Sequence, residues 1–213
     1  MGIRLVALTI GYLFGIFQTG YIYGKTQGID IREHGSGNAG ATNTLRTLGA
    51  KAGAITLLGD CFKPILAILL VKFLLGDMFT GDIKVLELYA GFGAVLGHNY
   101  PFYLKFKGGK GVACTAGVVI AIAPLAVPLC LVVFIICVKL TRYVSLGSIL
   151  MAILFILQIV LFNYYGFLGI NEASVLEFNL LSLAFSVMVI YRHKANIVRL
   201  MNGTENKISL KKK

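Results

Sequence analysis

The chain has 213 residues, of which 57% belong to the hydrophobic set AVILMFWYC and only 14% are charged. An average globular chain carries about 25% charged residues, so a soluble domain of this composition is excluded and lipid must solvate much of the surface. Disorder, a collagen-like structure and a disulfide scaffold are excluded as well. The chain has a net positive charge, with 20 Lys and Arg residues against 9 Asp and Glu residues. This excess favours anionic lipid headgroups or anionic substrates as partners, and we expect no nucleic acid.

Apolar runs of the length of a membrane span follow one another along the chain. A helix needs about 20 apolar residues to cross the hydrocarbon core of a bilayer. Such runs cover residues 3–23, 52–75, 85–103, 112–140, 143–165 and 178–191. The second run contains Asp60 and Lys63, which are one helical turn apart and are expected to pair inside the membrane. For this pair a structural role is at least as well supported as a functional one.

The run 112–140 either crosses once or turns back near Pro124. A single crossing would place Lys139 and Arg142 on the face opposite the basic loop 105–111. A hairpin of two short helices instead gathers most of the Lys and Arg residues on one face, as the positive-inside rule favours. Each arm would then have about 14 residues, which is short for a full crossing. The charge pattern therefore favours the hairpin.

These observations predict an all-α integral membrane protein with about seven transmembrane helices. The N-terminus is expected outside and the C-terminus in the cytoplasm. The whole chain, 1–213, is expected to form one polytopic membrane domain, in which 192–213 is a cytoplasmic C-terminal segment. Three polar segments converge on the basic face of this arrangement, and we expect the chemistry there.

The first polar segment, residues 35–43, is dense in glycine, amide and hydroxyl groups and is followed by Arg46. Glycines allow positive φ and close approach of the backbone to a ligand, and successive N–H groups can form an anion-binding nest. The segment is also the kind of composition found in flexible linkers. Its position between two spans favours a binding loop. Neutral hydrogen-bonding groups are available at Ser36, Asn38, Thr42 and Asn43. The planar guanidinium of Arg46 can bind a phosphate through two N–H groups.

The second polar segment places three glycines and two lysines directly before a predicted helix. They are Lys107, Gly108, Gly109, Lys110 and Gly111. Backbone donors at a helix N-terminus suit a phosphate. The segment is no Walker A loop, because Lys110 is followed by Gly111 where Mg²⁺ binding needs Ser or Thr. Nucleotide hydrolysis is therefore not indicated.

The third polar segment begins at residue 192, directly after the last apolar run. If it is helical, His193, Asn196 and Arg199 share one face at three-residue spacing. His193 is a candidate acid or base near neutral pH. Arg142 and Ser145, at the start of another helix on the same face, are candidates for the same site. No metal-ligand spacing is present, so we expect no metal.

Taken together, these segments resemble the acyl-phosphate:glycerol-3-phosphate acyltransferase family of bacteria (PlsY). The first resembles its SGNxGATN motif at 36–43, the second GHxxP…FKGGKG at 97–111, and the third RHxxNIxRLxxGxE at 192–205. Each motif alone is only weakly specific for the family, but three motifs in the same order and spacing along essentially the whole chain are highly specific. Two positions depart from the usual family pattern, Pro64 after Lys63 and Cys114 in the continuation of the second motif.

The resemblance implies an acyltransferase of the bacterial inner membrane that works on its cytoplasmic face, without a cofactor and as a monomer. It would move a fatty acyl group from acyl phosphate to the sn-1 hydroxyl of glycerol 3-phosphate. The products would be lysophosphatidic acid and phosphate, in the first acylation of phospholipid biosynthesis. By the same resemblance, Ser36 and Arg46 are required for activity, the loop 108–111 binds glycerol 3-phosphate, His193 and Asn196 support catalysis, and Glu205 is structural.

The chemistry of the residues agrees with such a reaction. An acyl phosphate is already activated, so the hydroxyl can attack it directly once both substrates are held in line. Lys107, Lys110 and Arg46 would neutralise the leaving phosphate. The proton acceptor is either His193 or a phosphate oxygen of the substrate. A transporter for anionic solutes is the competing hypothesis, but transporters place charged sites near the midplane and often show inverted repeats, and none is visible here. A non-catalytic scaffold would need no glycine-rich loops.

Overall fold

The computed structural model describes residues 1–208, and within them the chain is entirely helical. The α-helices are connected by short loops and single turns of 3₁₀-helix. Their bounds are α1 Gly2–Gly15, α2 Thr19–Thr26, α3 Ala41–Leu48, α4 Ala50–Leu75, α5 Ile83–Asn99, α6 Val112–Ile122, α7 Val127–Thr141, α8 Val144–Tyr164, α9 Glu172–Arg192 and α10 Lys194–Met201. The last five residues of the predicted C-terminal segment, 209–213, lie outside the described residues.

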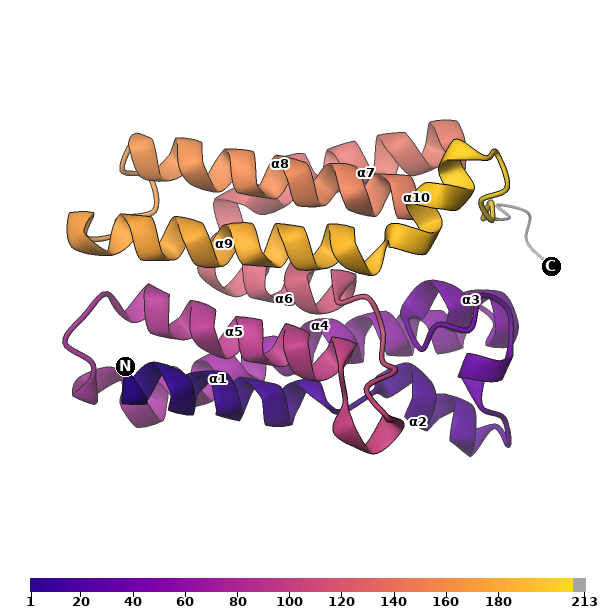
Figure 1. The fold of residues 1–213 in the computed structure, drawn as a ribbon, viewed down its shortest axis with the longest axis horizontal. Helices are drawn as coiled ribbons and strands as arrows, with labels where there is room; N and C mark the ends of the chain where they lie inside the picture. The colour runs from indigo at the N-terminus through magenta and orange to yellow at the C-terminus, as the bar shows by residue number, and fades with distance from the viewer. Residues whose placement is uncertain (209–213) are drawn as a thin grey trace.

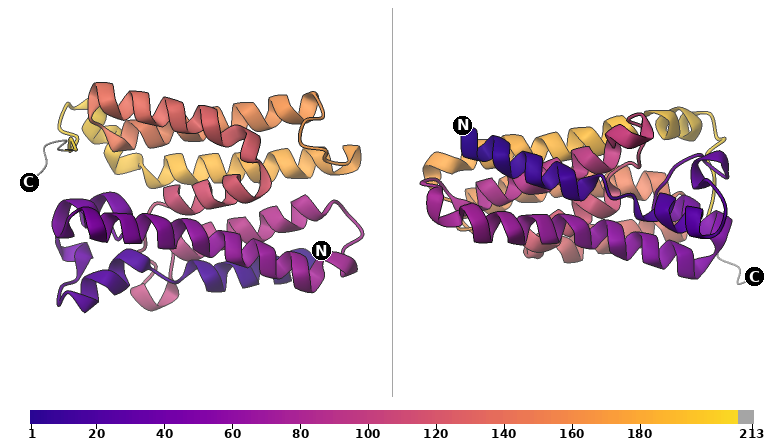
Figure 2. Two further views of the ribbon diagram at one scale, coloured as in Figure 1. Left: turned by 180° about the vertical axis from the view of Figure 1, so that it is seen from behind. Right: turned by 90° about the horizontal axis from the view of Figure 1, so that it is seen from below.

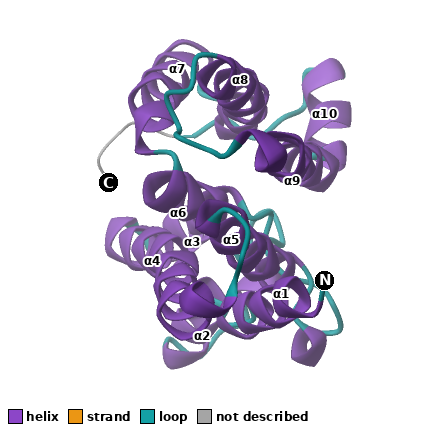
Figure 3. Cartoon of the chain, turned by 90° about the vertical axis from the view of Figure 1, so that its left-hand side faces the viewer, coloured by secondary structure: helices purple, strands orange, loops and turns teal. Residues whose placement is uncertain are grey.

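The long helices run side by side in two groups (Figures 1 and 2). The end-on view in Figure 3 shows α1 to α5 in one group and α7 to α9 in the other, with α6 where the two groups meet. The short helices α3 and α10 lie at the same end of the molecule, which we call the α3–α10 end (Figure 1). The N-terminus lies at the opposite end.

Helices α1 and α5 pack with their backbones in close contact. Gly11 and Gly15 of α1 face the backbone of Ala90 and Ala94, and a Cβ at either glycine would overlap a carbonyl oxygen of α5. Gly93 and Gly97 of α5 meet the backbone of α1 in the same way. Small residues four apart let transmembrane helices approach this closely. The packing fixes the C-terminal end of α5, which leads through a 3₁₀ turn at Phe102–Leu104 into residues 107–111, which we call the glycine-rich loop.

The first predicted span, 3–23, is interrupted in the structure, and this corrects the expectation of one continuous helix. α1 ends at Gly15 and α2 begins at Thr19. The break frees the carbonyl of Phe17, which accepts a hydrogen bond of 2.6 Å from the buried Nζ of Lys63. The side chain of Gln18 donates to the carbonyl of His98 at 2.9 Å. Broken helices at membrane depth are tolerated where protein groups satisfy the freed backbone in this way.

The run 112–140 turns back on itself in the structure. α6 ends at Ile122, a 3₁₀ turn at Pro124–Ala126 follows, and α7 then runs back toward the α3–α10 end (Figure 1). Among residues 1–208, five helical segments are long and apolar enough to cross a bilayer, and α6, with 11 residues, is a shorter apolar helix. α5 has 17 residues. The all-helical, membrane-spanning architecture is therefore present, and the count of seven crossings remains a prediction.

Candidate active site

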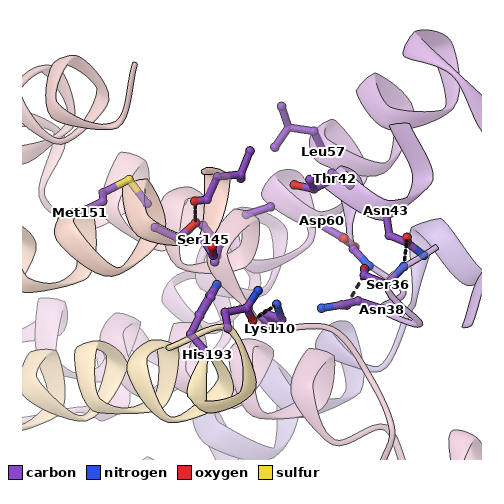
Figure 4. A pocket seen from close by; sticks show the side chains of 18 of the residues that line it. Ser36, Asn38, Thr42, Asn43, Leu57, Asp60, Lys110, Ser145, Met151 and His193 are labelled. Carbon is purple, nitrogen blue, oxygen red and sulfur yellow. Dashed lines mark hydrogen bonds between the residues drawn. The ribbon is translucent and has the colours of Figure 1, made fainter. Parts of the chain in front are cut away.

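A cavity of about 300 Å³ opens between the two helix groups (Figure 4). It receives side chains from all three polar segments, from α4 and α5 on one side and from α8 and α10 on the other. Of the predicted site residues it brings together Ser36, Asn38, Thr42, Asn43, Arg46, Lys110, Gly111, Ser145, His193, Asn196 and Glu205. The remaining predicted residues, Lys107, Gly108, Gly109 and Arg142, do not line it.

Part of the cavity wall is apolar. Helices α4, α6, α7 and α8 supply this part, with Leu57, Val112, Ala113, Ala116, Leu131, Phe134, Val144 and Met151. Polar groups occupy the walls formed by residues 36–46, by the glycine-rich loop and by α10, with further polar residues from α4, α5 and α8. One cavity therefore offers charged and hydrogen-bonding groups beside a hydrocarbon surface.

Asn43 holds the first polar loop in shape. Its Oδ1 accepts from the backbone N–H of Ser36 at 2.8 Å, and its Nδ2 donates to the carbonyls of Ile31 and His34 at 3.0 and 2.9 Å. The loop needs Gly35 at this point, because φ is +59° and a Cβ would overlap Oδ1 of Asn43. The amide predicted to bind substrate is thus used to build the loop that presents Ser36.

The same loop ends at the N-terminus of α3, which points into the cavity. Gly40 is the N-cap residue, and its N–H donates to Oδ1 of Asn38 at 3.1 Å. Within residues 1–208 this bond leaves the NH₂ group of Asn38 without a protein acceptor at the cavity wall. The first N–H groups of a helix have no intrahelical acceptor and carry partial positive charge. Among the described residues, the N–H groups of Ala41 and Thr42 have no acceptor, so the α3 terminus offers these two backbone donors to an anion.

The glycine-rich loop packs tightly on the end of α5. The N–H groups of Gly108 and Gly109 donate to the carbonyls of Asn99 and His98 at 3.2 and 3.1 Å. A Cβ on either glycine would overlap an atom of His98. Arg192 clamps the loop from the other side, with hydrogen bonds of 2.8 to 3.2 Å to the carbonyls of both glycines. These two glycines shape the loop, and their N–H groups are already used.

Gly111 brings the loop into the cavity. It is the N-cap residue of α6 with φ +78°, a conformation that favours glycine. Gly111, Val112 and Ala113 all line the cavity, so the N-terminus of α6 faces it as the N-terminus of α3 does. Lys107, three residues before Lys110, is exposed to solvent outside the cavity.

Lys110, Asn196 and Glu205 form a hydrogen-bonded chain across the cavity. Nζ of Lys110 donates to Oδ1 of Asn196, and Nδ2 of Asn196 donates to Oε1 of Glu205 at 2.8 Å. The same Oε1 accepts from the hydroxyl of Ser145 at 3.1 Å, and Oε2 pairs with Nε of Arg199 at 2.8 Å. Glu205 thus ties α8 to α10 and to the glycine-rich loop.

Burial and charge set the protonation of this chain. Burial lowers the pKa of Lys110 to about 8; the Glu205 charge opposes this shift and the nearby arginines add to it. Burial also disfavours the charged form of Glu205, but the hydrogen bonds from its three donors and the Arg199 charge outweigh that effect and lower its pKa. At neutral pH the chain therefore carries a protonated Lys110 and an ionised Glu205.

His193 presents a free nitrogen to the cavity. Its Nδ1 lies 2.7 Å from the carbonyl of Val189, so Nδ1 carries the proton and Nε2 keeps its lone pair. Burial, helped by the Lys110 charge, lowers the pKa of His193 to about 4. The imidazole is therefore neutral at physiological pH and can accept a proton at Nε2.

The C-terminal segment lies against the cavity at the α3–α10 end, where Asn206 lines it. Nη2 of Arg46 donates to the carbonyl of Asn206 at 3.0 Å, and the N–H of Ile208 donates to the carbonyl of Arg142 at 2.9 Å. The Arg142 side chain is exposed and lies outside the cavity lining. In this structure the contribution of Arg142 is through its backbone carbonyl.

The structure adds two buried ionisable residues to the cavity wall that were not among the predicted site residues. They are Asp60 of α4 and His98 of α5, with exposed fractions of 1% and 3%. Arg199 and Asn206 also line the cavity. The sequence carries a signal for Asp60, because an ionisable residue inside an apolar span is expensive and is a functional candidate by default. Nothing in the sequence shows that α4 and α5 bring Asp60 and His98 together.

Comparison with known proteins agrees with this geometry. A family model described as glycerol-3-phosphate acyltransferase matches residues 5–203. The chain belongs to this family. It is 45% identical over 210 residues to the glycerol-3-phosphate acyltransferase of Alkaliphilus metalliredigens, covering 98% of both chains. It is 44% identical to that of Bacillus subtilis, covering 96% of this chain and 98% of the relative.

The fold is also similar to that of a solved member of the family. This is the crystal structure of PlsY, an integral membrane glycerol 3-phosphate acyltransferase, in its glycerol 3-phosphate form. The TM-score is 0.81 at 32% identity, covering 97% of this chain and 96% of PlsY. A second PlsY structure, a lysophosphatidic acid form, has a TM-score of 0.80. The chain is accordingly a multi-pass helical membrane protein, and the resemblance drawn from its three motifs is confirmed.

Proposed function

We propose that the protein transfers a fatty acyl group from acyl phosphate to the sn-1 hydroxyl of glycerol 3-phosphate. The observation that carries this proposal is the convergence of two helix N-termini, those of α3 and α6, on one cavity with Arg46 and Lys110. Such termini bind phosphate groups, and two of them suit two phosphorylated substrates. The apolar wall beside them suits the start of an acyl chain.

Positioning and charge supply most of the catalysis in this proposal. The hydroxyl oxygen forms a bond to the acyl carbon, the bond from that carbon to the phosphate oxygen breaks, and inorganic phosphate leaves. Arg46 and Lys110 stabilise the negative charge on the leaving phosphate and on the developing oxyanion. Ser36, Asn38 and Thr42 orient the substrates with hydrogen bonds. Because the donor is already activated, no covalent enzyme intermediate is needed.

In the proposed reaction the proton of the attacking hydroxyl goes to Nε2 of His193. The neutral ring, held by Val189, has its lone pair toward the cavity. A His193→Asn variant keeps a donor at the Nδ1 position but has no base at the Nε2 position. A general base contributes roughly 10²- to 10⁴-fold, so kcat of this variant should fall at least a hundredfold. A decrease of kcat by less than tenfold would indicate that a phosphate oxygen of the substrate accepts the proton instead.

The setting of the reaction is part of the same proposal. The protein would act as a monomer in the bacterial inner membrane, with the α3–α10 end in the cytoplasm and the N-terminus outside. The opposite positions of the N-terminus and α10 support an odd number of crossings (Figure 1). The products, lysophosphatidic acid and phosphate, would enter phospholipid biosynthesis.

A donor-swap assay tests the proposal. Purified protein in detergent should form lysophosphatidic acid from palmitoyl phosphate and glycerol 3-phosphate. Palmitoyl-CoA and palmitoyl-acyl carrier protein should give none, and phosphate release should require glycerol 3-phosphate. Absence of product from a monodisperse, folded sample would remove the acyltransferase proposal, and equal rates with palmitoyl-CoA would remove acyl phosphate as the specific donor.

A further inference from the structure

Three ionisable side chains form a buried cluster in the cavity wall formed by α4 and α5. Oδ1 of Asp60 accepts from Oγ1 of Thr19 and from Nζ of Lys63, each at 3.0 Å. Nζ of Lys63 also donates to the carbonyl of Phe17 at 2.6 Å and lies 2.8 Å from Nδ1 of His98. Asp60, Lys63 and His98 are all at least nine-tenths buried.

The contacts of Lys63 determine the tautomer of His98. An ammonium group has three donors and no acceptor, and its three partners here are the Phe17 carbonyl, Asp60 and Nδ1 of His98. Nδ1 must therefore accept, so the proton of the neutral ring is on Nε2. The Nε2 edge of the ring lies against Gly109, because a Cβ on that glycine would overlap Nε2.

Two groups of the cluster are left for a ligand. Among residues 1–208, no protein group donates to Oδ2 of Asp60 and none accepts from Nε2 of His98. Both residues line the cavity, and their atoms bonded to Lys63, Oδ1 of Asp60 and Nδ1 of His98, are 3.7 Å apart. The cluster thus leaves one hydrogen-bond acceptor and one hydrogen-bond donor on two neighbouring residues of the same wall.

The charge of the cluster selects the chemistry of this ligand. Asp60 and Lys63 cancel and His98 is neutral, so this wall has no net positive charge, and a carboxylate oxygen repels a phosphate. A hydroxyl group, in contrast, donates one hydrogen bond and accepts others. The phosphates have Arg46, Lys110 and the two helix N-termini elsewhere in the cavity.

We infer that Asp60 and His98 bind the C2 hydroxyl of the glycerol 3-phosphate acceptor, with Asp60 accepting and His98 donating. The inference rests on the function proposed above. The C1 oxygen has to face the acyl carbon and His193, which belongs to the opposite helix group. The C2 hydroxyl does not react, so it can keep two fixed partners throughout. Lys63 is a positioning residue, since it acts through the other two.

A substrate lacking this hydroxyl tests the inference. With palmitoyl phosphate as donor, kcat/KM is measured for glycerol 3-phosphate and for 3-hydroxypropyl phosphate, which has no C2 hydroxyl. The wild-type protein should prefer glycerol 3-phosphate by roughly tenfold or more, because the analogue leaves two buried polar groups unpaired. In Asp60→Asn the preference should fall to about twofold or less. The new side chain keeps an oxygen for Thr19 and Lys63 but presents an NH₂ group to the cavity.

Variants of His98 separate recognition from a purely structural role. Gln places its terminal amide near the position of Nε2 and keeps a donor there, whereas Asn reaches only the Nδ1 position. We expect His98→Gln to retain most of the preference and His98→Asn to lose it. Glu87→Gln is the matched control, because Glu87 is a buried carboxylate paired with Lys72 at 3.1 Å outside the cavity. It should keep the full preference.

The outcomes separate the two proposals. If Asp60→Asn or His98→Asn keeps the wild-type preference, the inference is wrong. A wild-type protein that uses both acceptors equally well would also overturn it while leaving the acyltransferase proposal intact. If wild-type protein acylates neither acceptor, it is the proposed function that fails. Should Asp60→Asn not fold, the His98 pair alone decides the inference.

Discussion

At the scale of single residues, the charge of Lys110 depends on its surroundings. Burial lowers its pKa to about 8, so a large fraction of the free protein loses this charge in mildly alkaline solution. If the charged form binds phosphate, kcat/KM for glycerol 3-phosphate should be high below pH 8 and fall as the pH rises through that value. A pH profile of kcat/KM measures this directly, because it reports groups of the free enzyme.

Substitution of Lys110 and Glu205 checks the assignment of that titration. Lys110→Arg carries a charge that does not titrate in this range, so the alkaline fall should disappear or move upward. Glu205→Gln removes the carboxylate whose charge raises the pKa of Lys110, so the decrease of kcat/KM should occur at lower pH. Glu172→Gln, at the exposed start of α9, is the control and should leave the profile in place. An unchanged profile in Lys110→Arg would assign the titration to another group.

Residue-level prediction from the motifs was incomplete for a clear reason. The motifs identified which residues belong together, but not which of their atoms are already used. Asn43 bonds its own loop, and Gly108 and Gly109 bond the end of α5, although all three were expected to contact substrate. Their contacts depend on how each loop folds back on residues outside its own motif letters, and the spacing of the motifs does not show that geometry. Whether they also touch substrate stays a prediction.

At the scale of helices, the close packing of α1 on α5 supports the site, because it holds α5 in place. Gly11→Ala would put a Cβ against the carbonyl of Ala90, and overpacking of this kind costs about 1–3 kcal/mol. We expect a lower thermal midpoint in detergent and a loss of activity, because α5 carries His98 and holds the glycine-rich loop. Thermal unfolding monitored by size-exclusion chromatography measures the first effect.

A second glycine on the same helix provides the control. A Cβ added to Gly2, at the start of α1, would meet nothing within 4 Å, so Gly2→Ala should unfold at the wild-type temperature. Equal midpoints for the two variants would mean that the α1–α5 contact is looser than the structure has it. The spacing of four between Gly11 and Gly15, and between Gly93 and Gly97, is visible in the sequence. Which helices these pairs join is not.

At the scale of the whole molecule, the reversal at Pro124–Ala126 turns both open ends of the α6–α7 hairpin toward the α3–α10 end (Figure 1). Single cysteines replacing the exposed Lys105 and Lys139 should therefore react with an impermeant maleimide from the same side of the membrane. A cysteine replacing the exposed Asp77 should react from the other side. The background is a variant lacking the four native cysteines.

Inverted and right-side-out vesicles give the two directions of labelling. Positions 105 and 139 should label in inverted vesicles and position 77 in right-side-out vesicles. Labelling of position 139 together with position 77 would contradict the hairpin in the membrane. Labelling of 105 and 139 from outside would reverse the proposed orientation and move the active face away from the cytoplasm.

The sequence by itself determined the class of this protein and its family, and it predicted the face on which its chemistry lies. Composition and apolar run length are local properties, and the three motifs can be read in register without any contact between them. The tertiary structure decided what depends on distant segments meeting. The break between α1 and α2, the bonds from Arg192 to Gly109, and the cluster of Asp60 with His98 all arise from hydrogen bonds between residues far apart in the chain. Because buried polar groups must find partners wherever the fold places them, only the packed helices show which remain free for substrate.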